Sequence, residues 1–343
     1  SLRGNFQHGK VLLEMAGLYS GREGYAAISV QTSPGTPVQP DVFIPYTDLD
    51  WNSKPDRSYE TEHRANTDKN HPPITPSVTT EGSITFPAYP AGGLEHAFYG
   101  IFGSYTATTY SATPAYGYSY SQGSILPIFT LANGIRTLNY KRYSDVVFKS
   151  LKMEAKNKEK LEISVDGFSY MLDKSETALT PSYTTNNAFN FSDFSVSYGG
   201  SVANNILNAS ITIDRATEAY FTAGHGLNYG LQHSPYFACT GSMDVFFEDW
   251  SYYEDFMGDT NTFDDSPTSK ELIFTWTGDL LAGTTDKYRN LILTLPKVYL
   301  DDVPLPFKGD EAVQSSIAFT AVYSASDTKT ASAVITSNLA DIS

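Results

Sequence analysis

Residues 147–170, VFKSLKMEAKNKEKLEISVDGFSY, contain two runs in which apolar and polar residues alternate strictly. The apolar positions are Leu151, Met153, Ala155, Leu161, Ile163 and Val165. A period of two places them on one face of a β-hairpin and the polar residues on the other, with residues 157–160, three of them charged, at the turn. Because an isolated hairpin is only marginally stable in water, this one is predicted to belong to a larger sheet whose apolar face is covered.

Composition points to the same class of protein. The 343 residues include 24 Tyr and 20 Phe among many Ser, Thr and Gly, a mixture that favours strands and turns. The length suffices for one large or two ordinary domains. The single cysteine, Cys239, excludes an internal disulfide framework and is predicted to be a small buried residue. Apolar runs are much shorter than the roughly 18 residues of a membrane helix, so no membrane segment or signal peptide is expected.

Charge is distributed unevenly along the chain. The net charge of −15 at pH 7 argues against a surface that grips nucleic acid. Residues 1–179 contain 16 basic and 18 acidic residues, whereas residues 180–343 contain 7 and 20. Solubility is the simplest explanation of this acidity. The difference between the halves nevertheless indicates two surfaces that face different surroundings.

Further elements follow from local patterns. Strands are predicted over residues 26–30, 48–59, 79–86 and 126–131, and Asn133-Gly134 predicts a turn. Residues 94–102 place apolar side chains at helical spacing and are followed by Gly103, which predicts a short amphipathic helix.

The remaining segments are predicted to be irregular. Residues 1–24 are predicted to form an arm that docks on the chain or on a neighbour. Residues 57–78, with several prolines, and the Tyr/Ser/Thr-rich residues 104–123 are predicted to be loops. Residues 324–343 are predicted to form a tail that adds a strand to a neighbouring subunit.

The second half repeats the order of elements of the first. GSITF at 82–86 and GSMDVF at 241–246 each precede a short helix, 94–102 and 250–257, and a glycine follows each helix. Other matching segments are 51–62 with 210–221, 127–131 with 272–276, 147–157 with 291–301, and 161–170 with 315–323. This order predicts a tandem duplication, with domains at residues 1–179 and 180–343.

Residues that carry enzyme chemistry are scattered. The six histidines are dispersed, and the sequence lacks a phosphate-binding loop, a nucleophile elbow and a zinc-binding helix signature. Asp264-Asp265 and Asp301-Asp302 lie close to prolines and are predicted to be solvated turn residues instead of glycosidase acids. No catalytic, cofactor or metal site is predicted.

Two surface features allow two interpretations each. Eight Lys and Arg residues between positions 136 and 160 are interspersed with Asp145, Glu154 and Glu159, which favours a mixed-charge or subunit-pairing surface over one that grips DNA. Trp250, Tyr253 and Phe256 of the second helix either pack internally or contact another subunit.

Several stretches, taken in order, resemble the tail tube proteins of long-tailed bacteriophages. They are TSPGTPVQPDVFIPY at 32–46, EGSITFP at 81–87 before helix 94–102, RYSDVVFKSLKMEAKNKEKLEISVDGFSY at 142–170, SVANNILNASI at 201–211, and LILTLPKVYLDDVPLPFKGDEAVQSSIAFTAVY at 291–323.

This resemblance implies a mainly β fold of two tandem β-sandwich domains, each with one short flanking helix, whose inner strands join a ring-wide β-barrel around a lumen. The implied inner strands are residues 49–60, 79–86, 150–157, 161–170, 206–214, 240–247, 291–300 and 315–323. The implied lumen-facing residues are Ser150, Lys152, Glu154, Lys156, Glu162, Ser164 and Asp166.

The resemblance also implies surfaces that contact other subunits. Residues 57–78 and 216–234 resemble the loop that stacks one ring on the next, with candidates Arg57, Glu60, Glu62, Arg64, Asp68 and Lys69. The helices supply candidates for contacts within a ring: Phe98, Phe102, Trp250, Tyr253 and Phe256.

The function implied is that of a structural, non-enzymatic virion protein that is assembled in the host cytoplasm into the viral tail. Its partners are further copies of itself, in trimeric rings with pseudo-sixfold symmetry, together with tape-measure and tail terminator or tip proteins. Viral DNA passes through the lumen without specific binding, and no membrane is involved. Two alternatives remain open on the residues alone, a carbohydrate-binding surface protein of adhesin type and a β-sandwich glycosidase.

Overall fold

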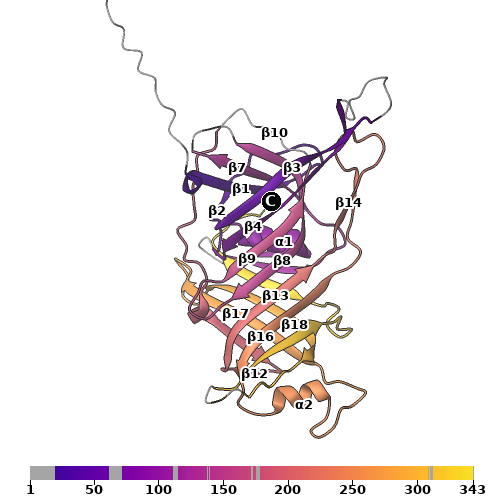
Figure 1. The fold of residues 1–343 in the computed structure, drawn as a ribbon. Helices are drawn as coiled ribbons and strands as arrows, with labels where there is room; N and C mark the ends of the chain where they lie inside the picture. Colours follow the sequence, from indigo (N-terminus) through magenta and orange to yellow (C-terminus); the bar gives the residue numbers. More distant parts are fainter. Residues whose placement is uncertain are drawn as a thin grey trace, which may run out of the picture.

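The computed structural model describes residues 20–61, 72–110, 115–136, 138, 140–170, 173–174, 178–307, 309 and 312–342. Over these residues the protein is mainly β, with large antiparallel sheets and two short α-helices, α1 (Leu94–Phe102) and α2 (Ser251–Met257). This confirms the predicted mainly β, sandwich-type fold. The first half of the chain forms the upper part of the molecule in Figure 1 and the second half the lower part, with α2 at the lower end.

The strands of the first half are β1 (Gly24–Gln31), β2 (Val42–Ile44), β3 (Asp48–Tyr59), β4 (Pro73–Pro87), β5 (Gly103–Thr109), β6 (Tyr116–Gln122), β7 (Ile128–Ile135), β8 (Lys141–Ala155), β9 (Glu162–Phe168) and β10 (Asp173–Lys174). Those of the second half are β11 (Phe194–Tyr198), β12 (Ser201–Ala203), β13 (Ile206–Asp214), β14 (Glu218–Tyr220), β15 (Leu231–His233), β16 (Ala238–Phe246), β17 (Lys270–Leu280), β18 (Tyr288–Asp302), β19 (Gln314–Ala321) and β20 (Ser332–Ser337). Short 3-10 helices at Gly21–Glu23 and Phe191–Asp193 precede β1 and β11.

One continuous sheet crosses both halves, and we call it the inner sheet. Its strands run in the order β3–β4–β9–β8–β13–β16–β19–β18, and every neighbouring pair is antiparallel. The two halves meet where β8 pairs with β13, from Ser150 opposite Asp214 to Ala155 opposite Ala209. We call this pairing the internal joint.

A second layer covers the inner sheet. In the first half it contains β2, β1, β7 and the start of β8, and in the second half β12, β11, β17 and the start of β18. The long strands β8 and β18 therefore belong to both layers. Each has a register shift where it passes from one layer to the other, within residues 143–146 of β8 and 295–298 of β18. A second shift follows in the inner sheet, at Phe148/Ser150 and at Leu300/Asp302, and β-bulges of this kind bend a strand.

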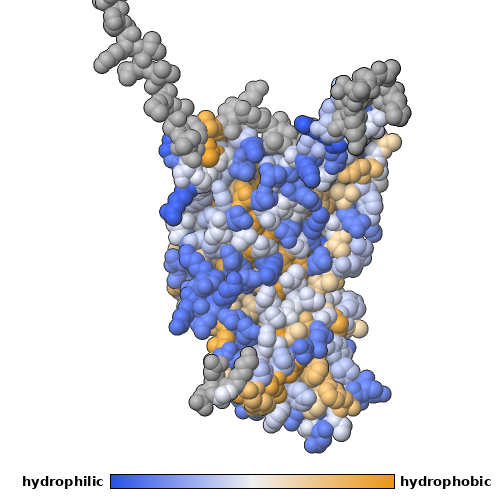
Figure 2. All heavy atoms as spheres, in the orientation of Figure 1, coloured by the Kyte–Doolittle hydropathy of each residue, from blue (hydrophilic) through white to orange (hydrophobic). Residues whose placement is uncertain are grey.

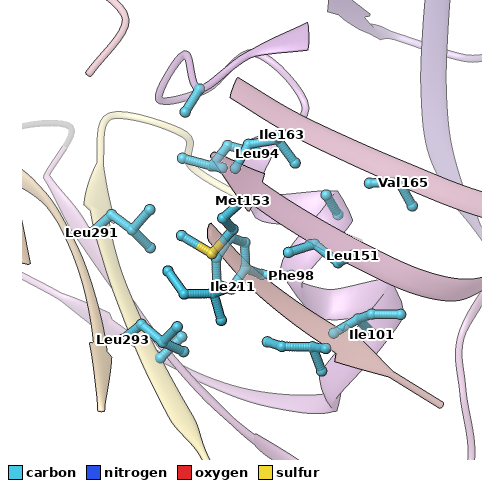
Figure 3. Close-up of a cluster of buried hydrophobic side chains, with 14 of the residues drawn as sticks. Leu94, Phe98, Ile101, Leu151, Met153, Ile163, Val165, Ile211, Leu291 and Leu293 are labelled. Atoms are coloured by element: carbon cyan, nitrogen blue, oxygen red, sulfur yellow. The ribbon is translucent and has the colours of Figure 1, made fainter. Parts of the chain in front are cut away.

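The core lies between the layers and is shared by both halves. Leu94, Phe98 and Ile101 of α1 point toward the buried side chains of β8 and β9 (Figure 3). Ile211 of β13 and Leu291 of β18 complete the same cluster. The fold therefore gives the two halves one contiguous hydrophobic core.

The hairpin and the first helix match their sequence-based predictions. β8 and β9 pair across residues 147–168, and Leu151, Met153, Ile163 and Val165 are all buried. α1 has the predicted bounds, and Gly103 caps it in the left-handed conformation with φ 85°.

Other local predictions were wrong. Residues 104–123 are not a loop, because β5 and β6 form a hairpin that buries Tyr118 and Tyr120. Asn133-Gly134 is not a turn, because both residues pair with β1 within β7. Arg136, directly after β7, has the left-handed φ of 47°. The predicted loop 57–78 is shorter than expected, since β3 and β4 pair as far as Tyr59 and Pro73.

The C-terminal segment also differs from its prediction. Within residues 324–342, β20 pairs with β18 and with β6 of its own chain. It is therefore part of the second layer of its own chain.

Candidate functional site

The inner sheet has one dry and one wet face. The dry face consists of the buried apolar side chains that pack under the second layer. The wet face consists of the polar side chains that alternate with them along each strand and point away from the core. Figure 2, drawn from the same side as Figure 1, shows hydrophilic residues over much of this surface.

All seven lumen-facing candidates lie on the wet face. Their cross-strand pairs are Ser150 with Asp166, Lys152 with Ser164, and Glu154 with Glu162, and Lys156 follows in the same alternation. The Ser150 hydroxyl donates a hydrogen bond to Asp166 Oδ2 over 2.9 Å. The alternation in the sequence therefore correctly predicted that these side chains lie on one face of the sheet.

Ion pairs order the charges near the internal joint. Glu154 forms an ion pair with Lys152 and a second with Lys156, whose Nζ lies 2.6 Å from Glu154 Oε2. Lys152 and then Lys156 lower the pKa of the Glu154 carboxyl by hydrogen bonding. Because these side chains are partly exposed, the pairs contribute little to stability.

Two open hollows lie on the wet face. One is lined by side chains of β3, β4, β8 and β9, namely Asp50, Lys54, Asp56, Glu81, Lys149 and Asp166. The other crosses the internal joint and is lined by Glu154, Lys156, Glu159, Asn208, Ser242 and Asp244. Acidic side chains outnumber basic ones in both. The arrangement therefore presents a hydrated surface that is acidic on average, with interspersed lysines.

The stacking-loop candidates are only partly within the described residues. Arg57 is exposed on β3 and Glu60 is half-buried just beyond it, on the hairpin that projects past the body of the molecule (Figure 1). Glu62, Arg64, Asp68 and Lys69 lie outside the described residues.

The corresponding segment of the second half folds back on its own chain. It contains the hairpin β14–β15, and it carries Tyr229, whose hydroxyl donates to the Asp145 carbonyl over 2.7 Å. The Tyr229 ring packs edge-on against Phe168 and Tyr170 at centroid distances of 5.0 and 4.8 Å. This segment therefore fastens the second half to the first, a role that the sequence did not indicate.

The helix candidates separate into two groups. Phe98 and Phe102 are completely buried in the chain's own core and have no surface to offer another subunit, which removes them as contact residues. Trp250 is 52% exposed, and its ring packs edge-on against Tyr253, which in turn contacts Phe256. Only α2 therefore remains as a candidate contact helix.

The two ends of the inner sheet are the features that sequence reasoning missed. In the part of the chain that the structure describes, β3 pairs only with β4, and the last residues of β18 pair only with β19. Lys54 on β3 and Asp302 on β18 are exposed at these edges. Strand alternation alone does not reveal which strands end a sheet.

The described residues show little sign of catalytic chemistry. They contain no group of three or more His, Cys, Asp or Glu side chains arranged to hold a metal ion. Cys239 is fully buried, as predicted, and burial raises the pKa of its thiol to about 12. None of the helices within this part of the chain is long and apolar enough to span a membrane.

Comparison with known proteins agrees with the architecture. The sequence matches the family model described as phage tail tube protein over residues 21–321, which includes all eight strands of the inner sheet. A comparison with individually curated proteins found no match. The match covers most of the chain and confirms the resemblance seen in its motifs. The chain belongs to the phage tail tube protein family and is a structural component of the virion tail.

Proposed function

We propose that copies of this chain assemble into stacked rings that form the hollow conduit for DNA ejection. The observation that carries this proposal is the inner sheet, which is continuous over eight strands and polar on one face, and whose end strands have no further strand partner among the described residues. An open sheet edge pairs readily with another strand, and closing the sheet into a barrel removes every edge. The wet face would then line the lumen.

We further propose that the chain is a tandem duplication with domains at residues 1–179 and 180–343. The pairings of β1 with β2 and β7 correspond to those of β11 with β12 and β17. The order β3–β4–β9–β8 corresponds to β13–β16–β19–β18, and a 3-10 helix with a capping box precedes each half. If each half occupies one sixth of a ring, three chains complete it with pseudo-sixfold symmetry.

The charge of the wet face supports passage of DNA without binding. Carboxylates repel phosphates, whereas a surface that neutralised phosphates with lysines would hold the duplex. The interspersed lysines, such as Lys149 and Lys152, soften this repulsion. We propose that a tape-measure protein occupies the same lumen before DNA, and that tail terminator and tip proteins bind the two ends of the tube.

Electron microscopy of the purified full chain tests this function. We expect rings, or hollow tubes with a regular axial repeat, once the protein concentration exceeds an assembly threshold. A chain that stays monomeric in analytical ultracentrifugation at high concentration, over a range of salt and pH, would contradict the proposal.

A further inference from the structure

At the internal joint, strand β8 of the first half pairs with strand β13 of the second half. The Arg215 amide donates to the Lys149 carbonyl over 2.8 Å. In an antiparallel pair, alternate residues direct both backbone groups at the partner strand, so Leu151, Met153 and Ala155 also face β13. Ser150 and Asp214 then form a pair without mutual hydrogen bonds, and their side chains lie on the wet face.

The bulge in β18 shows which residues correspond to this edge of β8. We align β18 with β8 so that the register shift at Leu300/Asp302 coincides with the one at Phe148/Ser150. In this alignment Asp302 is equivalent to Ser150. Continuing along the chain, Val303, Leu305 and Phe307 take the places of Leu151, Met153 and Ala155. Val303 is buried and Leu305 is half-buried, which is the alternation expected of a continued strand.

Two glycines show which residues of β3 correspond to which residues of β13. A Cβ on Gly82 would lie 2.1 Å from the Asp50 carbonyl oxygen, and a Cβ on Gly241 would lie 2.5 Å from that of Ser210. Asp50 therefore corresponds to Ser210, and both carbonyls face the next strand inward. Four residues further along, Lys54 corresponds to Asp214, while the backbone groups of Leu49, Trp51 and Ser53 point to the side of β3 away from β4. On that side the Trp51 carbonyl also accepts a hydrogen bond from the Tyr143 hydroxyl over 2.6 Å.

We propose that β3 of one copy pairs antiparallel with residues 302–307 of a second copy, in the register of the internal joint. This places Lys54 opposite Asp302, Ser53 opposite Val303, Trp51 opposite Leu305, and Leu49 opposite Phe307. The proposal rests on the proposed function, since it names the contact through which neighbouring chains of a ring join.

The prolines of this segment fit the proposed register. Pro304 and Pro306 correspond to Lys152 and Glu154, whose backbone groups point away from β13. A proline at such a position removes no hydrogen bond across the joint. The residues that would donate to β3, namely Val303, Leu305 and Phe307, all keep their N–H groups. The Trp51 carbonyl, which accepts from the Tyr143 hydroxyl, keeps a second lone pair for the Leu305 N–H.

Side chains at the two edges are complementary. Lys54 and Asp302 are exposed, and neither forms an ion pair with a residue that the structure describes. Phe307 is 72% exposed, whereas Ala155 and Ala209, the residues at this level of the internal joint, are each 3% exposed. Pairing with a second copy would bring opposite charges together and cover Phe307 with Leu49.

Disulfide cross-linking tests the register. Cα atoms in a pair without mutual hydrogen bonds lie about 4.5 Å apart, within the range of about 4.4–6.8 Å that a disulfide requires. We expect the full-length double variant Lys54→Cys/Asp302→Cys, oxidised under assembly conditions, to form covalent dimers and trimers on a non-reducing gel. The buried Cys239, whose thiol has a raised pKa, would compete poorly.

Three matched variants control this experiment. Ser150→Cys/Asp214→Cys reproduces the same pair at the internal joint and should close a disulfide within one chain. Lys54→Cys/Pro304→Cys shifts the register by two residues and should cross-link at least tenfold less. Each single variant should remain monomeric on the gel.

The outcomes separate the register from the proposed function. Rings without the 54–302 cross-link, while the 150–214 disulfide closes, would overturn the register and leave the function standing. Equal cross-linking of the shifted pair would overturn it as well. Absence of both rings and intermolecular cross-links at every concentration would overturn the proposed function together with this inference.

Discussion

At the scale of residues, two adjacent titratable groups on α1, Glu95 and His96, are buried in the core. Glu95 accepts a hydrogen bond from the Ala91 amide over 2.8 Å, and burial raises the pKa of its carboxyl. Burial also lowers the pKa of His96 to about 4. Next to them, the Tyr118 hydroxyl donates to the Leu339 carbonyl over 2.7 Å. The native fold therefore favours the neutral form of both groups.

His96 should make the fold sensitive to acid. Because its pKa is lower in the folded than in the unfolded chain, the stability that it contributes is complete above about pH 6.5 and is lost as the pH falls toward 4. The loss should approach about 3 kcal/mol for a shift of this size. Urea denaturation of the unassembled chain, followed by circular dichroism at pH 7, 5.5 and 4, measures it. In His96→Gln the decline should be clearly shallower.

Glu95→Gln is the matched control for this experiment. The raised pKa of Glu95 means that its contribution is complete below its ordinary pKa and is lost as the pH rises. Glu95→Gln should therefore gain stability at pH 7 relative to the wild type, and its decline toward pH 4 should be steeper. Identical pH dependence in the wild type and His96→Gln would contradict the assignment.

At the scale of elements, local signals explain which predictions succeeded. The bounds of α1 follow from an apolar stripe and a capping glycine, and the β8–β9 hairpin follows from strict alternation next to a charged turn. Both depend on neighbours in sequence. The wet-face candidates Ser150 to Asp166 could be grouped from the sequence for the same reason.

The failures share a different cause, which is pairing between distant segments. The β5–β6 hairpin is stabilised by β20, where Tyr118 pairs with Ile335 more than two hundred residues away. Nothing within residues 104–123 indicates this partner. The internal joint likewise pairs Met153 with Ile211, which is distant in sequence. A strand forms the edge of a sheet when no further strand pairs with it, and a local sequence pattern does not show this. The order of the strands in the sheet therefore could not be predicted from local sequence patterns.

The segment between β13 and β16 yields a prediction about elements. Tyr229 is 7% exposed and holds this segment against β9, so Tyr229→Ala should leave a cavity and destabilise the chain by about 3 kcal/mol. Tyr229→Phe removes only the hydrogen bond to Asp145 and should cost about 1 kcal/mol. Limited proteolysis should cleave the Ala variant within residues 216–234 first.

Circular dichroism and the protease resistance of the wild type are the controls for the Tyr229 variants. The circular dichroism of the Ala variant should stay that of the wild type, because the inner sheet does not depend on β14–β15 for its pairing. Equal protease resistance of the wild type and the Ala variant would show that this segment is held by other contacts.

At the scale of the whole molecule, charge and sheet geometry work together. One sheet supplies both the mechanical continuity between halves and the hydrated face that a passing polymer would meet. Ion pairs such as Lys156 with Glu154 neutralise only part of the acidic charge of this face, since acidic side chains outnumber basic ones in both hollows. A conduit needs this combination, because a surface that binds its cargo would also hold it.

If the wet face lines the lumen of the proposed tube, reversing its charge should make the tube bind DNA. Asp50, Glu81 and Asp166 are exposed and line one hollow, so changing all three to Lys should leave folding and ring assembly intact. Assembled tubes of this variant should retain short linear duplex DNA at about 50 mM salt and release it steeply as salt rises. Fluorescence anisotropy of labelled DNA, with wild-type tubes as reference, measures the effect.

The shape of the DNA and the position of the charges provide the controls for this prediction. A closed circular duplex cannot thread into a tube, so the wet-face variant should retain linear but not circular DNA. Changing Asp265, Glu271 and Asp286 to Lys adds the same charge at exposed positions outside the inner sheet. Any binding by that variant should make no distinction between linear and circular DNA, because it would take place on the outer surface. If the wet-face variant also held both forms equally, the wet face would not line a lumen, since only an enclosed surface can discriminate between two duplexes by their ends.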